Sequence, residues 1–130
     1  MTDFYTCSEA YETEIYEKGA VGRVQVDFAV SATQLPALEK SLRTYFATLE
    51  QMDAETAAGF EGDETFYSGG WAYHVTWRSG QQPLIVLASA GLDACSSLSF
   101  ASQYLLEAIE EDLPGLEVTF TELPTRPASA

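Results

Sequence analysis

The sequence predicts an α+β domain with a ferredoxin-like βαββαβ sandwich, in which two helices cover one face of a mainly antiparallel sheet. Three segments alternate apolar and polar residues with the period of a β-strand, and two others place apolar residues at intervals of three and four, as amphipathic helices do. The predicted order is strand, helix, strand, strand, helix, strand, the split βαβ pattern of ferredoxin-like folds. A length of 130 residues with 46% hydrophobic residues suits a single packed domain, residues 1–130. The likeness is architectural and identifies no family.

The first predicted strand is GRVQVDFAV, residues 22–30, in which Val24, Val26 and Phe28 share one face. Apolar residues then recur at helical spacing from Thr33 to Met52, which predicts the first amphipathic helix. The preceding residues 10–22 are a candidate for an extra N-terminal strand hairpinned onto residues 22–30. Residues 1–10 are expected to be frayed.

Residues 54–70 contain glycines and acids without a sustained period, which indicates a long loop with a short strand near Phe66. Residues 71–78 alternate again and form a predicted hairpin with the apolar run at residues 83–90. The second helix is expected over residues 94–113, with Phe100 and Tyr104 broadening its core-facing stripe. Residues 116–123 alternate as the last strand, and residues 124–130 are a predicted frayed tail.

The charge balance excludes some partners. Twenty acidic residues face six basic ones, so the net charge is −14. Nucleic acid and anionic membranes both require positive surface and are therefore not expected partners, whereas a basic protein is an allowed one. A solubilising role for the acidic surface is the competing interpretation. The sequence has no secretory signal pattern and no run of about 20 apolar residues, which predicts a cytoplasmic protein with Cys7 and Cys95 as reduced thiols.

The sequence offers little support for catalysis. It has one histidine and lacks the serine-nucleophile, zinc, P-loop and dinucleotide-binding motifs. The acids of the long loop do not match the ligand spacing of an EF-hand. We therefore predict no catalytic residue, no metal and no cofactor. An enzymatic function is less expected than a binding function.

The leading functional hypothesis is a small acidic protein that docks on a basic surface of a partner, in the manner of inhibitor or immunity proteins. This is an analogy from size and charge. Two acidic groups are candidates for the contact, one in the long loop and one at the end of the second helix: Glu61, Asp63 and Glu64, and Glu107, Glu110 and Glu111. Loops carry binding residues more often than helix ends do, which favours the loop group.

The alternative hypothesis is a ferredoxin-like dimer that binds or converts a small molecule. Alternation in residues 71–78 places Trp71, Tyr73, Val75 and Trp77 toward the core and His74 and Arg78 on the opposite face. A ferredoxin-like order would lay that face beside Ile85, Leu87 and Asp27. The predicted pocket therefore uses His74, Arg78 and Asp27, and the chain is expected to be a monomer or a homodimer.

Overall fold

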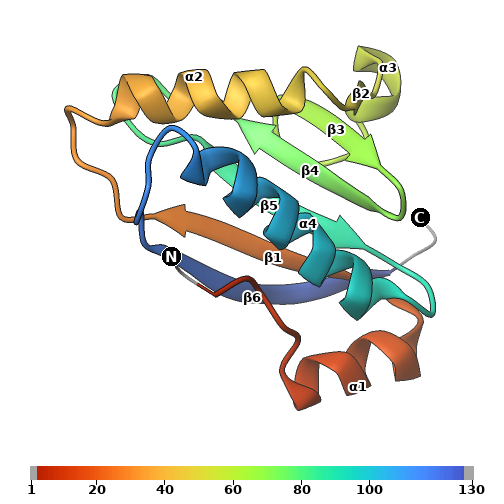
Figure 1. The fold of residues 1–130 in the computed structure, drawn as a ribbon. Coiled ribbons are helices and arrows are strands. Elements are labelled where there is room, and N and C mark those ends of the chain that lie inside the picture. The colour runs from red at the N-terminus through yellow and green to blue at the C-terminus, as the bar shows by residue number, and fades with distance from the viewer. Residues whose placement is uncertain (1–2, 128–130) are drawn as a thin grey trace.

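The computed structural model describes residues 3–127, which form ten helices and strands (Figure 1). The helices are α1 (Glu9–Lys18), α2 (Leu35–Phe46), α3 (Ala54–Ala57) and α4 (Ala94–Glu110). The strands are β1 (Ala20–Phe28), β2 (Glu50–Gln51), β3 (Glu64–Ser68), β4 (Trp71–Thr76), β5 (Leu84–Ser89) and β6 (Val118–Pro127).

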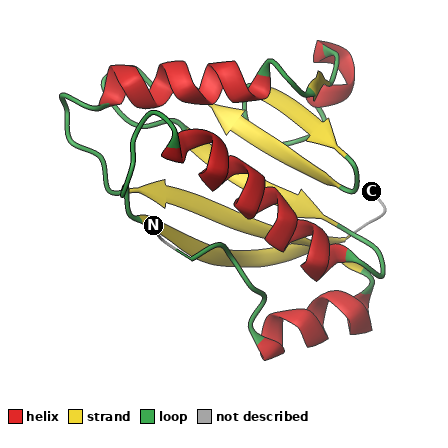
Figure 2. Cartoon of the chain, in the orientation of Figure 1, coloured by secondary structure: helices red, strands yellow, loops and turns green. Residues whose placement is uncertain are grey.

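All six strands pair antiparallel in one sheet of order β2-β3-β4-β5-β1-β6, and α2 and α4 lie over the same face (Figure 2). The α+β class, the antiparallel sheet and the two helices on one face are thereby confirmed. The ferredoxin-like topology is not confirmed, because the sheet has six strands and its order differs. β2 and β3 extend the sheet beyond β4. β3 is the short strand predicted near Phe66 in the expected loop, whereas β2 lies in residues expected to end the first helix. That prediction was wrong at its C-terminal end, because α2 stops at Phe46 and residues 50–51 pair with β3.

The core lies between the sheet and the two long helices. The strand alternation is confirmed by complete burial of Val24, Tyr73 and Val75 on the helix side. The phenol of Tyr73 remains hydrogen-bonded there, because its hydroxyl donates to the Ala101 carbonyl and lies 2.7 Å from the hydroxyl of Tyr45. Its polar atom is therefore satisfied inside the core.

The candidate N-terminal strand is wrong, since its residues form helix α1 and the start of β1. The Ser8 hydroxyl accepts a hydrogen bond from the Tyr11 amide at the start of α1, and Gly19 ends the helix with a φ of 59°. Tyr11 and Ile15, one turn apart, are the buried residues of the helix. The Tyr11 hydroxyl also bonds the Leu123 carbonyl at 2.6 Å, which anchors α1 to β6.

A disulfide joins Cys7 to Cys95, so the prediction of reduced thiols is wrong. The sequence separation of 88 residues gave no sign of it, because only the fold brings the two Cα atoms to 5.8 Å. The bond ties the N-terminal segment to the start of α4, and the Tyr5 amide donates to the hydroxyl of Ser102 further along the same helix.

The expected fraying at the two ends is not what the described residues show. Residues 3–10 are held by the disulfide and by α1, and residues 124–127 belong to β6 and pair with β1. The remainder of both predictions, residues 1–2 and 128–130, lies outside the described part of the chain. Within residues 3–127, no helix has the length and apolar character needed to span a bilayer.

Candidate functional site

The sheet face opposite the helices is more enclosed than the sequence predicted. His74 is only 3% exposed, although it was expected on a mixed polar face beside Ile85 and Leu87. Strand pairing instead places His74 opposite Val86, while Ile85 and Leu87 point into the helix-side core. The prediction therefore placed Ile85 and Leu87 of β5 on the wrong face of the sheet. A pairing shifted by one residue has this effect, because successive side chains of a strand point to opposite faces.

The loop between α3 and β3 covers this face. The ring of Phe60 stacks on the imidazole of His74 with centroids 5.3 Å apart, and the His74 Nδ1 atom lies 2.9 Å from the Thr65 hydroxyl. Glu61 receives two hydrogen bonds from the Arg23 guanidinium, at 2.8 and 2.7 Å. The loop is therefore fastened to the sheet by an aromatic stack and a bidentate ion pair.

Burial and charge set the ionisation of this cluster. Burial lowers the pKa of His74, against an opposing effect of the nearby Glu61 carboxylate. Hydrogen bonds from Arg23 lower the pKa of Glu61, and the same hydrogen bonds raise the pKa of Arg23. At neutral pH the cluster therefore holds an uncharged imidazole beside an ion pair.

The loop acids do not form one surface. Glu61 is bound to Arg23 on the face opposite the helices, whereas Glu64 lies toward the helix side and accepts a hydrogen bond from the Trp77 indole at 3.0 Å. Asp63 is exposed, and its amide donates to the Val75 carbonyl. Two of the three predicted docking residues thus have partners within the chain, and these two carboxylates lie on opposite sides of the sheet.

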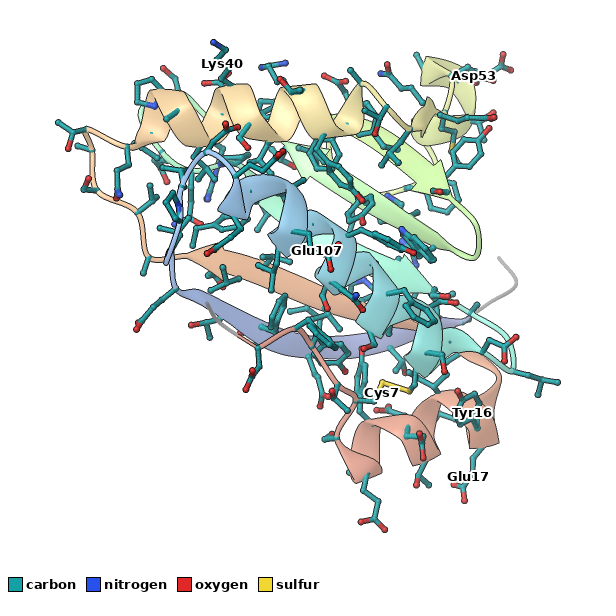
Figure 3. The ribbon with its side chains drawn as sticks, viewed as in Figure 1. Cys7, Tyr16, Glu17, Lys40, Asp53 and Glu107 are labelled. Atoms are coloured by element: carbon teal, nitrogen blue, oxygen red, sulfur yellow. A yellow bond between two sulfur atoms is a disulfide. The ribbon has the colours of Figure 1, made fainter. Side chains whose placement is uncertain are left out.

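The helix acids are more accessible. Glu107 and Glu111 are exposed, and Figure 3 shows Glu107 on the outer side of α4, away from the sheet. Glu110 turns back instead, and its carboxylate accepts a hydrogen bond from the Gly115 amide that closes the turn after the helix. The helix group therefore offers two exposed carboxylates, of which that of Glu107 accepts a hydrogen bond from Gln103 on the same helix, and a third that stabilises the turn after the helix.

The same side of α4 carries two exposed aromatic rings that the sequence placed in the core. Phe100 is 49% exposed and Tyr104 is 47% exposed. The prediction failed because α4 is apolar over more of its circumference than the sheet and α2 can cover. We call Phe100, Tyr104, Glu107 and Glu111 the α4 stripe, since their spacing of four, three and four residues aligns them along one side of a helix. Trp71 stacks on Tyr104 with centroids 5.8 Å apart and supports its ring.

The pocket predicted from His74, Arg78 and Asp27 is not formed by these three residues together. Arg78 lines a cavity of about 550 Å³ between the start of α2 and the β4–β5 turn, and neither His74 nor Asp27 borders it. Asp27 accepts hydrogen bonds from Gln25 on β1, and His74 is enclosed by Phe60. Sequence alternation could not reveal this cavity, because its two walls come from segments about 40 residues apart.

Comparison with protein-family models, with curated proteins and with solved structures found no match for this chain. Among the described residues, no group of three or more histidine, cysteine, aspartate or glutamate side chains is arranged to hold a metal ion.

Proposed function

We propose that this chain is an acidic interaction protein that docks the α4 stripe on a basic surface of a partner protein, in the manner of small inhibitor or immunity proteins. The observation that carries the proposal is the pair of exposed rings, Phe100 and Tyr104, aligned with the exposed carboxylates of Glu107 and Glu111 on one side of α4. Aromatic side chains are the residues on which binding energy concentrates at protein interfaces.

The two halves of the stripe have different roles in this proposal. The rings would supply contact area, because covering half-exposed aromatic side chains removes apolar surface from water. Glu107 and Glu111 would attract a basic partner and raise the association rate, as charged rims do. A net charge of −14 extends that attraction over the whole molecule.

The helix group is preferred to the loop group for a physical reason. Using Glu61 in an interface would require breaking its ion pair with Arg23, and using Glu64 would release the indole of Trp77. Among the described residues, the carboxylate of Glu107 has one hydrogen-bond partner, the half-buried Gln103 on the same helix, and that bond is exposed. A partner can therefore reach the helix carboxylates at lower cost.

The disulfide indicates the kind of compartment in which such a partner would bind. Disulfides persist in oxidising compartments and are reduced in most cytoplasms. The Cys7–Cys95 bond therefore favours an oxidising compartment over the cytoplasmic location that the sequence predicted.

The rings are tested by Phe100→Ser with Tyr104→Ser in the disulfide-bonded protein. The matched control is Tyr67→Ser, which removes another exposed aromatic ring, 38% exposed, from β3. A basic protein captured at low salt is purified, and its affinity for each variant is measured by calorimetry. We expect a 1:1 complex whose affinity falls at least about tenfold in the double variant and stays unchanged in the control. Equal affinities for the double variant and the wild type, or failure to obtain any saturable basic partner, would overturn the proposal.

The carboxylates are tested separately with Glu107→Gln and Glu111→Gln. The control variant, Glu50→Gln with Glu55→Gln, removes the same amount of charge from β2 and α3. Stopped-flow measurements should show slower association and a weaker salt dependence for the α4 pair than for the control pair. Identical rates for the two pairs would mean that net charge alone, rather than the α4 stripe, steers the encounter.

A further inference from the structure

The cavity between α2 and the β4–β5 turn has the size of a small-molecule site. Its volume of about 550 Å³ lies within the range of roughly 300–1,000 Å³ that is usual for ligand pockets. Its apolar walls are Leu35 and Pro36 from α2, with Trp77 and Pro83 flanking the turn. A planar ligand would find an indole and two proline rings there.

The cavity lacks the strong negative charge of the whole molecule, because its lining holds one acid, Glu39, and one base, Arg78, among the described residues. Of the six basic residues in the chain, Lys40, Arg43 and Arg78 lie on α2 or on the adjoining turn; Figure 3 shows Lys40 on the outer side of α2. The guanidinium of Arg43 stacks over the Trp77 ring at 3.9 Å and also binds Glu39 at 3.0 Å. Glu39 pairs with Arg43, and no other acid among the described residues lines the cavity, so the charge of Arg78 has no acidic partner there.

Arg78 is held in position by the turn itself. Its Nε and Nη2 atoms donate to the Gln82 carbonyl at 2.9 and 2.7 Å. The Gln82 side chain bonds both the amide and the carbonyl of Phe28, each at 2.7 Å, which fixes the turn against β1. The Nη1 atom of Arg78 has no hydrogen-bond partner among the described residues, so a positioned guanidinium keeps donors available.

We propose that this cavity binds a planar aromatic molecule that carries one anionic group, a carboxylate or a phosphate. The ring packs against Trp77 and the two prolines, and the anion accepts hydrogen bonds from the free side of Arg78. A charge-assisted hydrogen bond of this kind is about twice as strong as a neutral one, which gives an anion the advantage over an uncharged ring. No residue of the α4 stripe lines the cavity, so this site does not depend on the proposed docking function.

The test compares one ring with three substituents: 2-naphthoate, 2-naphthyl phosphate and the uncharged 2-naphthalenemethanol. Calorimetry gives each affinity, and the indole N–H resonances of the two tryptophans report the location. We expect saturable 1:1 binding of at least one anion, about tenfold tighter than that of the alcohol. The Trp77 resonance should shift and the Trp71 resonance should not. The anion that binds more tightly shows whether the cavity prefers a carboxylate or a phosphate.

Two variants complete the experiment. Arg78→Gln should reduce binding of the anion to the level of the alcohol, because the ring contacts remain and the charge is lost. Arg126→Gln, the matched control on β6, should leave both affinities unchanged. Equal binding of the anions and the alcohol, an unchanged affinity in Arg78→Gln, or no saturable binding of either anion would overturn the proposal. None of these results would bear on the α4 stripe.

Discussion

His74 shows how a loop residue can decide the environment of a strand residue. Alternation correctly places its side chain away from the helices, on a face that in an antiparallel sheet is commonly exposed to solvent. Phe60, which is 14 positions earlier in the chain, covers the imidazole, and Thr65 on the neighbouring strand bonds its Nδ1 atom. Residue type and period therefore predicted the side of the sheet but not the burial, because the covering residue comes from a segment without a period.

The burial of His74 predicts a pH dependence of stability. Its pKa in the folded protein is lowered by burial, so the unfolded chain takes up a proton first as the pH falls through about 6.5. Arg23 and Arg126 also disfavour the charged imidazole, whereas Glu61 favours it. The free energy of unfolding should therefore decrease on acidification from pH 7 toward pH 5, before most carboxylates titrate.

The chain has one histidine, so His74→Gln should flatten this decrease. Urea denaturation at several pH values between 5 and 7 measures the slope for both proteins. The comparison uses the slope rather than the absolute stability, because glutamine alters the contact with Phe60 as well. A wild-type slope that persists in the variant would assign the pH dependence to other groups.

At the scale of elements, the long alternating and periodic segments were predictable and the short ones were not. The strand predicted over residues 22–30 is β1, Ala20–Phe28, two residues earlier at each end, and its buried Val24 and Val26 satisfy period and residue type together. β2 has only two residues, too few to show any period, and is specified by its pairing with β3. Residues 9–18 have a weak apolar stripe, so the sequence pattern did not distinguish the helix α1 from a strand.

The disulfide is the clearest case of an element-level contact that the sequence could not indicate. Cys7 and Cys95 have no diagnostic spacing, and only the packing of the N-terminal segment on α4 brings them together (Figure 3). The cavity at Arg78 was missed for the same reason, since α2 and the β4–β5 turn meet only in the fold. Contacts between distant segments depend on topology, which periodicity does not encode.

The Cys7–Cys95 bond should contribute strongly to stability. Closing a loop with a separation of 88 residues restricts the unfolded chain, and native disulfides contribute about 2–4 kcal/mol in this way. Cys7→Ser with Cys95→Ser should lower the free energy of unfolding in urea by about that amount. The wild type measured in reductant should match the double variant. A variant as stable as the oxidised wild type would show that the N-terminal segment is held by its other contacts, such as the Tyr5–Ser102 bond.

For the whole molecule, the dominant feature is an excess of negative charge that few internal pairs relieve. Within residues 3–127 there are three ion pairs, and two of these join exposed or half-exposed residues one turn apart on a helix. Exposed pairs of that kind contribute little. The composition predicted the excess of charge from the sequence alone, but only the structure distinguishes carboxylates held in an ion pair, such as Glu61, from exposed ones without a basic partner, such as Glu107.

The excess charge predicts that salt stabilises the fold, because screening weakens repulsion among the carboxylates. The effect should be concentrated at the end of α4, where Glu107, Glu111 and Asp112 are exposed near the negative pole of the helix dipole. Glu107→Gln, Glu111→Gln and Asp112→Asn together should raise the free energy of unfolding by about 1 kcal/mol at low ionic strength. The gain should shrink as NaCl rises from about 0.1 M to about 1 M, over which the Debye length falls from about 10 Å to about 3 Å.

Urea denaturation of the triple variant and the wild type at both salt concentrations measures these differences. The matched control replaces Glu9, Glu12 and Glu17 of α1 by glutamine, which removes the same charge from another helix. Glu9 and Glu12 lie in the first turn of α1, where the dipole favours negative charge, so the control should gain less stability than the α4 variant. Equal gains in the two variants would show that net charge alone matters. A loss of stability in the α4 variant would show instead that these carboxylates make stabilising contacts, and they would then be less available to a basic partner.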